Sequence, residues 1–193
     1  MYRVIIFDFF DVIHIDPLAA MLRARSRQRE GLVLKASEAL DEGKIGTDEF
    51  FGRLAVAFNE SVEALKKECM AYTAVNDELI PLIEDLARHY KVGLLSNAGQ
   101  DYLRGLLHDH DLQRLFDHVV ISSEVGMAKP DPAIFEHTLA KLGAKAEESI
   151  FIDDNPMHVD AASILGMQGL VYTDVRTLRT SLQTLGITMA PTN

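Results

Sequence analysis

The sequence contains a single cysteine, no tryptophan and no long hydrophobic run. Because Cys69 is the only thiol, no disulfide can form within the chain, which excludes a disulfide-stapled scaffold and fits a reducing compartment. The first apolar run, Val4–Phe7, is interrupted by Asp8 after four residues. A signal peptide needs a longer apolar centre, and a membrane span needs about 20 apolar residues. We therefore expect no membrane contact and a cytoplasmic location.

Basic charge is scarce as well. Lys and Arg number 19 against 29 Asp and Glu, which gives a formal net charge of −10. Such a chain is a poor candidate for binding a nucleic-acid backbone. Apolar residues make up 48% of the 193 residues and charged residues 25%, which excludes disorder and suits one globular domain with room for a small insertion. The oligomeric state stays open at this point.

Short apolar runs, rich in β-branched residues, recur along the chain. Such runs are typical of strands buried on both faces. Helical patterns lie between them; one of these has Asp131 as its predicted N-cap and Gly143 as its stop. This alternation predicts an α/β fold with a Rossmann-like parallel sheet. The predicted strands are 3–7, 91–95, 118–121, 149–152 and 169–172.

One region departs from the alternation. From about Pro17 to Tyr72 the sequence shows helical patterns and no convincing strand. Phe51, Leu54 and Phe58 follow helical spacing after Thr47, the predicted cap of that helix. We therefore predict a core formed by residues 1–15 and 76–193, with residues 16–75 inserted after the first strand as a helical cap.

Three acidic positions follow predicted strands. Asp8 comes after the first strand, and Asp153 and Asp154 come after the fourth. The carboxyl ends of parallel strands share one edge of a sheet, where ligands bind. Converging carboxylates repel one another unless a cation lies among them, and oxygen ligands with open positions suit Mg²⁺. A carboxylate beside Mg²⁺ can also act as a nucleophile and form an aspartyl-phosphate.

The same edge is expected to gather groups that bind phosphate. Ser96 and Asn97 follow the second strand, and Lys129 lies in a loop beyond the third. A hydroxyl and an ammonium group can hold the oxygens of a transferring phosphoryl group. Each residue alone has a simpler interpretation as a turn, a cap or a solvated side chain. Together they predict a phosphoryl-transfer site that takes a small phosphorylated metabolite.

Four segments resemble the motifs of the haloacid dehalogenase-like hydrolase superfamily, and the resemblance covers nearly the whole chain. It implies a Rossmann-like core with an inserted helical cap, Asp8 as the nucleophile, and phosphate binding by Ser96 and Lys129. Residues 42–51 are similar to the cap of small sugar-phosphate phosphatases, including glucose-1-phosphatase-like members. The four segments are Phe7–Ile13, Leu94–Asn97, Lys129–Pro132 and Ile152–Asp154.

The resemblance also implies a Mg²⁺ site. Its ligands would be Asp8, Asp154 and the backbone carbonyl of Phe10, with Asp153 acting through water. Phe10 nevertheless departs from the phosphatase pattern, which has a second aspartate there as general acid and base. General acid–base catalysis contributes about 10²–10⁴-fold, so we expect slow turnover or selectivity for good leaving groups.

Two residues near Phe10 are candidates to supply the missing proton. Asp11 is the next residue, although a turn cap is its better interpretation. His14 follows closely, and its alternative is a structural histidine. His158 replaces the asparagine usual in the fourth motif; it either supports that motif or is a tolerated change.

The departure at Phe10 leaves two other functions open. Haloacid dehalogenases of the superfamily also have an aromatic residue there, and they attack carbon with the same aspartate and use no metal. An impaired member that only binds a ligand or a partner is the other alternative. Asp153 and Asp154 weigh against a dehalogenase, since an acidic pair gains nothing without a cation. We therefore predict a Mg²⁺-dependent hydrolase of small phosphomonoesters.

Overall fold

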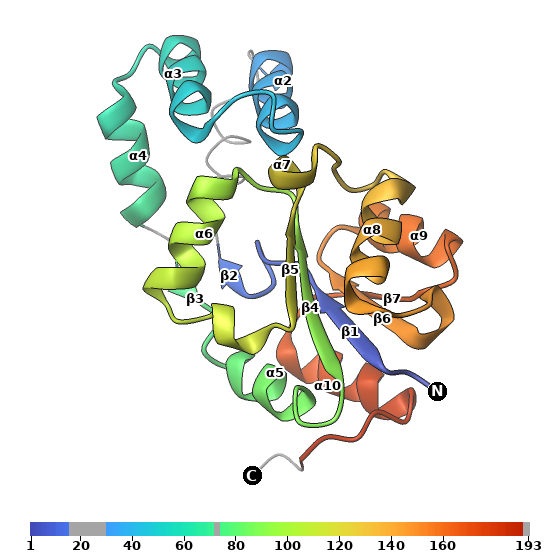
Figure 1. Cartoon of the computed structure of the whole chain (residues 1–193). Helices are drawn as coiled ribbons and strands as arrows, with labels where there is room; N and C mark the ends of the chain where they lie inside the picture. Colours follow the sequence, from blue (N-terminus) through green and yellow to red (C-terminus); the bar gives the residue numbers. More distant parts are fainter. Residues whose placement is uncertain (16–29, 72–73, 191–193) are drawn as a thin grey trace.

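The computed structural model describes residues 1–15, 30–71, 74–190, and its core is a five-stranded parallel sheet (Figure 1). The strand order is β5-β4-β1-β6-β7, so β1 lies in the centre between β4 and β6. This arrangement confirms the predicted α/β fold. The strands are β1 (Val4–Phe7), β4 (Lys91–Ser96), β5 (His118–Ile121), β6 (Ser149–Asp153) and β7 (Gln168–Val171).

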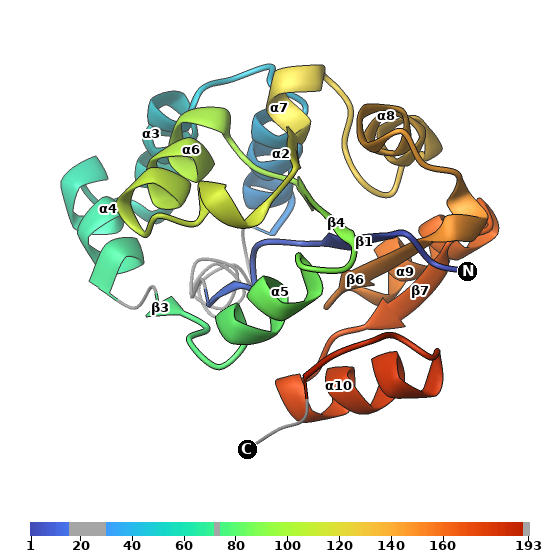
Figure 2. The ribbon, with the colours of Figure 1, turned by 60° about the horizontal axis from the view of Figure 1, so that its bottom comes forward.

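Alternate residues of β1 point to opposite faces of the sheet, and both faces are covered by helices. Ile5 and Phe7 belong to one apolar core, and Val4 and Ile6 belong to the other. This explains why the strands read as continuous apolar runs. One face is covered by α5 (Ile80–Leu86), α6 (Gln100–Asp109) and α10 (Val175–Thr184), and the other by α8 (Pro132–Leu142) and α9 (Pro156–Ile164) (Figures 1 and 2).

The helix over Pro132–Leu142 begins and ends as its sequence predicts. The Asp131 side chain accepts a hydrogen bond from the backbone N–H of Ala133, and Pro132 occupies the first turn. Gly143 ends the helix in the left-handed conformation with φ 63°. The capped start fixes the point at which the preceding loop, which contains Lys129, meets the helix.

Three helices between β1 and β4 pack around an apolar core of their own. They are α2 (Glu30–Asp41), α3 (Thr47–Phe58) and α4 (Val62–Ala71), and their core includes Ala36, Phe50, Leu54 and Leu65. The predicted cap, residues 16–75, includes them, but its residues 16–29 and 72–73 lie outside the described part of the chain. The cap boundaries therefore stay a prediction.

Two details of this region differ from the sequence-based expectation. The N-cap of α3 is Gly46 rather than Thr47, because the helix begins one residue earlier, and no side chain caps it. Two short strands that were not predicted also lie where the chain enters and leaves the insertion. These are β2 (His14–Ile15) and β3 (Ala74–Val75), which pair antiparallel. Strands of two residues are too short to show the alternation of apolar and polar residues by which a strand is recognised in a sequence.

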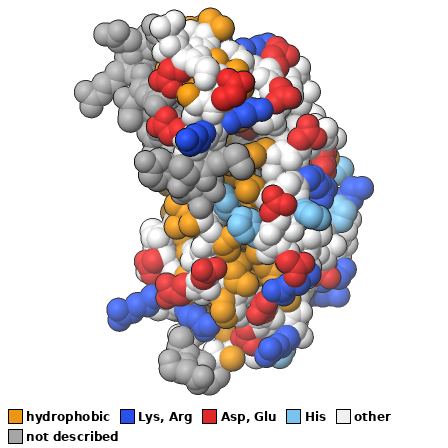
Figure 3. Space-filling view, turned by 90° about the vertical axis from the view of Figure 1, so that its left-hand side faces the viewer, with side chains coloured by type: hydrophobic (Ala, Val, Ile, Leu, Met, Phe, Trp, Pro, Cys, Tyr) orange, Lys and Arg blue, Asp and Glu red, His pale blue; other side chains and the backbone are white. Residues whose placement is uncertain are grey.

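The remaining short elements connect the layers. They are α7 (Ser122–Val125), η1 (Gln113–Leu115) and η2 (Ala146–Glu148). Among the described residues, no helix combines the length and the apolar character that crossing a membrane requires. On the face shown in Figure 3, acidic and basic side chains are interspersed around exposed hydrophobic ones.

Candidate active site

The polar residues at the strand ends meet at one edge of the sheet. Asp8 directly follows β1, Ser96 ends β4, and Asp153 ends β6. Because β1 pairs in parallel with both β4 and β6, the carboxyl ends of the three strands are neighbours. All three side chains are buried. The sequence-predicted residues at these positions are therefore brought together.

Lys129 joins this group from the loop that precedes α8. Its Nζ lies 2.8 Å from Oδ1 of Asp8 and 2.7 Å from Oδ2 of Asp153. The same ammonium donates to the backbone carbonyl of Leu95 at 3.2 Å. Only 1% of the Lys129 side chain is exposed. Buried charges need such partners, since an unpaired charge would carry a large desolvation cost.

The two aspartates respond differently to the same lysine. Burial raises the pKa of Asp8 to about 7, against the opposing pull of Lys129 and with a further rise from Asp153. Burial also acts on Asp153, but Lys129 and His158 outweigh it and lower its pKa to about 2. Desolvation would lower the pKa of Lys129, yet the two carboxylates hold it above its ordinary value. Of the two aspartates, Asp153 is therefore the one that Lys129 holds more strongly in its ionised form.

Asn97 fixes the backbone of the lysine loop. Its side-chain Nδ2 donates to the carbonyl of Lys129 at 2.9 Å, and its Oδ1 accepts from the Lys129 N–H at 2.8 Å. The two bonds together orient the amide and hold the loop against the end of β4. Asn97 thus positions Lys129, while the prediction that Asn97 binds phosphate stays a prediction.

Ser96 carries a hydroxyl that is available to a ligand. Its Oγ is buried and has no hydrogen-bond partner among the described residues. A buried hydroxyl without a partner is costly, and such groups in native proteins call for an explanation such as a ligand or an ion. Ser96 lies at the end of β4, next to the strand that Asp8 follows.

Three carboxylates offer a place for a cation. One oxygen from each of Asp8, Asp153 and Asp154 lies within 4.8 Å of the other two. Burial and the charges of Asp153 and Asp11 raise the pKa of Asp154, so the ionised cluster is electrostatically unfavourable by itself. Hard oxygen donors with an excess of negative charge fit Mg²⁺. The residues present therefore suit the predicted metal.

His158 supports the acidic cluster from α9. Its Nδ1 lies 3.1 Å from Oδ2 and 3.2 Å from Oδ1 of Asp153, and its Nε2 lies 3.4 Å from the amide nitrogen of Asn155. Asn155 caps the same helix by accepting from the backbone of Met157. Of the two interpretations of His158, the structure favours support of the fourth motif. A hydrogen bond to a metal-binding carboxylate orients that carboxylate.

Phe10 lies in a small aromatic cluster beside Asp8. Its ring stacks on Tyr102 with centroids 6.0 Å apart and meets Phe9 edge-on at 5.1 Å. Asp11 turns the chain with φ 57°, a left-handed value that aspartate tolerates. The position two residues after Asp8 is thus apolar and packed.

His14 is the less suitable of the two candidate proton donors. It is fully buried and stacks on Phe9, with ring centroids 5.3 Å apart. Burial and the nearby His110 lower its pKa to about 4, so the ring is neutral at pH 7. Neither ring nitrogen has a hydrogen-bond partner among the described residues. This environment is that of a packed core residue.

Asp41, at the end of α2, was missed by the sequence-based reasoning. It is half-buried, and its charge interacts with Lys129 and His158 of the strand-end cluster. Burial raises its pKa to about 7, against the opposing effect of these two groups. One signal was available. Acidic residues are unfavourable in the last turn of a helix, and this turn holds Asp41 and Glu38 with no basic residue.

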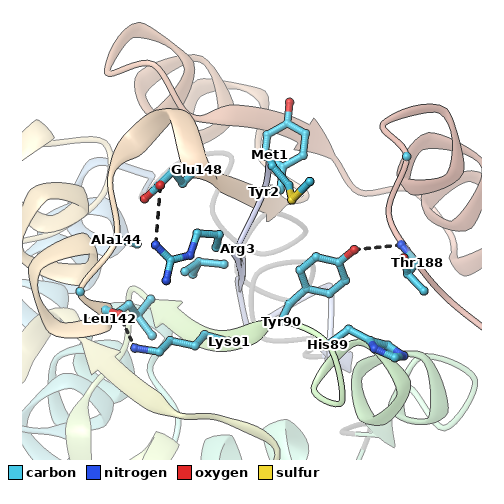
Figure 4. Close-up of a pocket in the computed structure, with 13 residues that line it drawn as sticks. Met1, Tyr2, Arg3, His89, Tyr90, Lys91, Leu142, Ala144, Glu148 and Thr188 are labelled. Carbon is cyan, nitrogen blue, oxygen red and sulfur yellow. Dashed lines mark hydrogen bonds and ion pairs between the residues drawn. The ribbon is translucent and has the colours of Figure 1, made fainter.

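A cavity of about 550 Å³ lies at the opposite end of the sheet, where β1 and β4 begin (Figure 4). Several of its polar groups pair with one another. Arg3 lies 3.8 Å from Glu148, and the Tyr90 hydroxyl accepts from the Thr188 backbone at 2.9 Å. None of the predicted site residues line this cavity. The chemistry-bearing residues are therefore concentrated at the other edge.

Comparison with known families supports the chemistry of this edge. The haloacid dehalogenase-like hydrolase family matches residues 2–166, which include every residue of the cluster. The chain belongs to the haloacid dehalogenase-like (HAD) hydrolase family. Its curated relatives include phosphatases, so this chain is a HAD-like hydrolase with phosphatase homologues.

Two of these relatives show the extent of the similarity. The sesquiterpene phosphatase astK of Aspergillus oryzae is 28% identical over 141 residues, which cover 71% of this chain and 72% of the relative. A phosphoserine phosphatase of Thermus thermophilus is 33% identical over 112 residues, which cover 58% of this chain and only 45% of that protein. The match to the second relative thus spans less than half of its length.

Solved structures share the fold. A HAD family enzyme from Bacteroides thetaiotaomicron, in complex with magnesium and inorganic phosphate, has a TM-score of 0.74 at 18% identity, with 92% of this chain and 99% of that chain covered. A 2-haloacid dehalogenase from Pseudomonas syringae has a TM-score of 0.60 at 19% identity, with 96% and 100% covered. At these identities the similarity shows the HAD fold alone.

Proposed function

We propose that this HAD hydrolase cleaves small phosphomonoesters with the help of Mg²⁺, through an aspartyl-phosphate on Asp8. The observation that carries the proposal is the buried Asp8–Lys129–Asp153 cluster with the unpartnered hydroxyl of Ser96 beside it. A nucleophile, a buried ammonium and a free hydroxyl at one point suit a phosphoryl group, which carries negative oxygens around an electrophilic centre.

Each residue has a defined task in this proposal. An Oδ atom of Asp8 attacks phosphorus, and the bond to the ester oxygen breaks as the new bond forms. Lys129 and Ser96 hold the phosphoryl oxygens, and Asn97 keeps the lysine loop in place. Water then cleaves the aspartyl-phosphate and releases inorganic phosphate.

Asp8, Asp153, Asp154 and the backbone carbonyl of Phe10 would hold the metal. Bound Mg²⁺ would neutralise charge on the phosphate and on the cluster, which also favours the ionised, nucleophilic form of Asp8. The helices of the predicted cap, residues 16–75, would cover the site and select a small, sugar-phosphate-like substrate. The partner is thus a small phosphorylated metabolite.

Dehalogenation is a second candidate, favoured by one observation. The side chain two residues after Asp8 is an aromatic ring packed on Tyr102. In that reaction the same Asp8 oxygen would attack carbon and displace halide. The acidic group of Asp8, Asp153 and Asp154 makes phosphate hydrolysis the stronger proposal, since carbon chemistry gives these charges no use.

A hydrolysis panel separates the two candidates. We would measure phosphate release from para-nitrophenyl phosphate and several sugar phosphates, and halide release from a 2-haloacid, with Mg²⁺ and with chelator. The blank is Asp8→Asn, and the matched control is Asp160→Asn, an exposed aspartate of α9. We expect Mg²⁺-dependent phosphate release that Asp8→Asn abolishes and Asp160→Asn preserves. Chelator-insensitive halide release would overturn the proposal.

A further inference from the structure

Cleavage of an alkyl phosphate leaves a basic alkoxide, which must receive a proton as the P–O bond breaks. The described residues around Asp8 are poorly suited to donate it. Phe10 carries no proton. Lys129 is engaged by two carboxylates that hold its pKa above the ordinary value, and Asp153 is ionised, with a pKa of about 2. The buried cluster therefore offers no donor, and Asp11, in the exposed turn after Phe10, is the alternative to a donor from the cap helices.

We propose that Asp41 of α2 is the general acid that protonates the leaving oxygen, and the general base in the step that follows. This inference rests on the proposed phosphatase function and deepens it. It makes a helix of the predicted cap a part of the catalytic machinery. It also explains how a site with Phe10 beside the nucleophile can act on poor leaving groups.

The docking of α2 on the core places Asp41 at the strand ends. The neighbouring Leu40 packs on Gly99, in the loop after β4, so closely that a Cβ on Gly99 would lie 2.8 Å from Leu40 Cδ1. Gly43 approaches the carbonyl of Ser123, in α7 just after β5, and leaves no room for a Cβ there. Figure 1 shows the end of α2 directly above α7. Asp41 lies between these two anchors.

The docked loop and the core enclose a cleft of about 280 Å³. Leu40, Gly43 and Thr47 line it from the cap side, and Gly99 and Ser123 from the core side. Gly43 has φ 71°, a conformation that favours glycine, so the turn after Asp41 is fixed by the backbone. A side chain on such an anchored helix end is held more precisely than one on a free loop.

The charges and the burial around Asp41 suit a side chain that gives up and takes back a proton. The positive charges of Lys129 and His158, on the core side, lower the pKa of Asp41. The negative charges of Glu38 and Glu42, in its own helix and turn, raise it. Burial is the largest influence and places its pKa at about 7, so both protonation states are accessible at neutral pH. Its position at a helix carboxyl end, where the backbone carbonyls repel a carboxylate, is unfavourable for stability. A role in proton transfer would explain why an acidic residue stands at this helix end.

The two steps balance in atoms and protons. In the first, the Asp8–phosphorus bond forms, the bond from phosphorus to the ester oxygen breaks, and protonated Asp41 transfers its proton to that oxygen to give the alcohol. In the second, the Asp41 carboxylate takes a proton from water as the water oxygen attacks phosphorus. The Asp8–phosphorus bond then breaks, and Asp8 and protonated Asp41 are restored.

The test compares Asp41→Asn and Asp41→Glu with the control Glu63→Gln, an exposed glutamate of α4. The substrates are para-nitrophenyl phosphate, whose leaving group needs little protonation, and β-glycerol phosphate, whose leaving group is an alkoxide. We expect Asp41→Asn to lower kcat for the alkyl ester by about 10²–10⁴-fold and to change the aryl ester by less than about 10-fold. Asp41→Glu should restore part of the alkyl activity.

The outcomes distinguish this inference from the function it rests on. Equal losses on both esters, or no loss on either, overturn the role of Asp41 as the acid while Asp8-dependent phosphate release still stands. A change confined to KM would assign Asp41 to substrate binding and also overturn it. If the wild-type protein cleaves neither ester, the proposed function fails and this inference fails with it.

Discussion

The ammonium nitrogen of Lys129 lies 2.8 Å from Oδ1 of Asp8, and both side chains are buried. The lysine is shared with Asp153, so one buried cation faces two buried carboxylates. Such a cluster stabilises the fold only while all its members are present. Removing one partner of a buried ion pair leaves an uncompensated charge and costs about 3–5 kcal/mol.

We therefore expect Lys129→Gln to lower the free energy of unfolding by about 3–5 kcal/mol and to abolish phosphate release. Urea unfolding at neutral pH would measure the loss. Lys141→Gln, an exposed lysine of α8, is the control and should unfold within about 0.5 kcal/mol of the wild-type protein. A Lys129 variant as stable as this control would mean that removing the lysine leaves no uncompensated charge on Asp8 and Asp153.

Phe10→Asp restores a carboxyl group two residues after the nucleophile. In the Asp41→Asn background we expect it to raise the alkyl phosphatase activity at least about 10-fold, since a proton donor is returned. In the wild-type background the gain should be smaller, because Asp41 already supplies the proton.

The new carboxylate would also enter the aromatic cluster of Phe9, His14 and Tyr102, so a loss of about 1–3 kcal/mol in stability is expected. Phe10→Asn is the matched control, because it adds a polar group of similar size without an acidic proton. Equal gains from both variants would indicate relief of packing rather than acid catalysis.

The fold and the strand-end residues were readable from the sequence for a physical reason. Strands buried on both faces must be apolar throughout, so the run Val4–Phe7 and its counterparts mark the sheet. The residue after each run then falls at one common edge, which locates Asp8, Ser96 and Asp153 without any knowledge of side-chain contacts.

Other parts of the site depend on packing between distant segments, which periodicity does not specify. The helical patterns between Pro17 and Tyr72 predict helices but not the surface on which the last turn of α2 docks, so Asp41 was not assigned. Asn97 gave no sign that its amide would hold the backbone of Lys129, a residue 32 positions away. The start of α3 at Gly46 rather than Thr47 is a backbone detail of one residue.

His158→Ala tests the support of the acidic cluster. Its imidazole contacts both carboxylate oxygens of Asp153, so we expect the variant to bind Mg²⁺ about 10–100-fold more weakly. Titration of phosphatase activity with Mg²⁺ would show the shift, and saturating Mg²⁺ should recover most of the rate. His89→Ala, at the opposite end of the sheet, is the control (Figure 4). Identical Mg²⁺ dependence in the two variants would contradict a supporting role.

The buried His14 predicts a loss of stability in mild acid. Burial, with a smaller effect of His110, lowers its pKa from 6.5 to about 4. The unfolded chain therefore takes up a proton that the folded chain rejects between these two values. The stability associated with His14 is complete above about pH 6.5 and is lost as the pH falls towards about 4, at a total of about 3 kcal/mol.

Replacing the ring by an apolar group of similar volume, as in His14→Leu, should remove this pH-dependent contribution to the free energy of unfolding. Urea unfolding at about pH 8 and at about pH 5 would then show a smaller loss of stability in the variant than in the wild-type protein. Asp8 and Asp41 titrate in both proteins, so their contributions cancel in the comparison. Because neither ring nitrogen of His14 has a hydrogen-bond partner among the described residues, Asp8-dependent phosphate release should persist in the folded variant. An identical pH dependence of stability in the two proteins would mean that His14 is protonated in the fold as readily as in the unfolded chain.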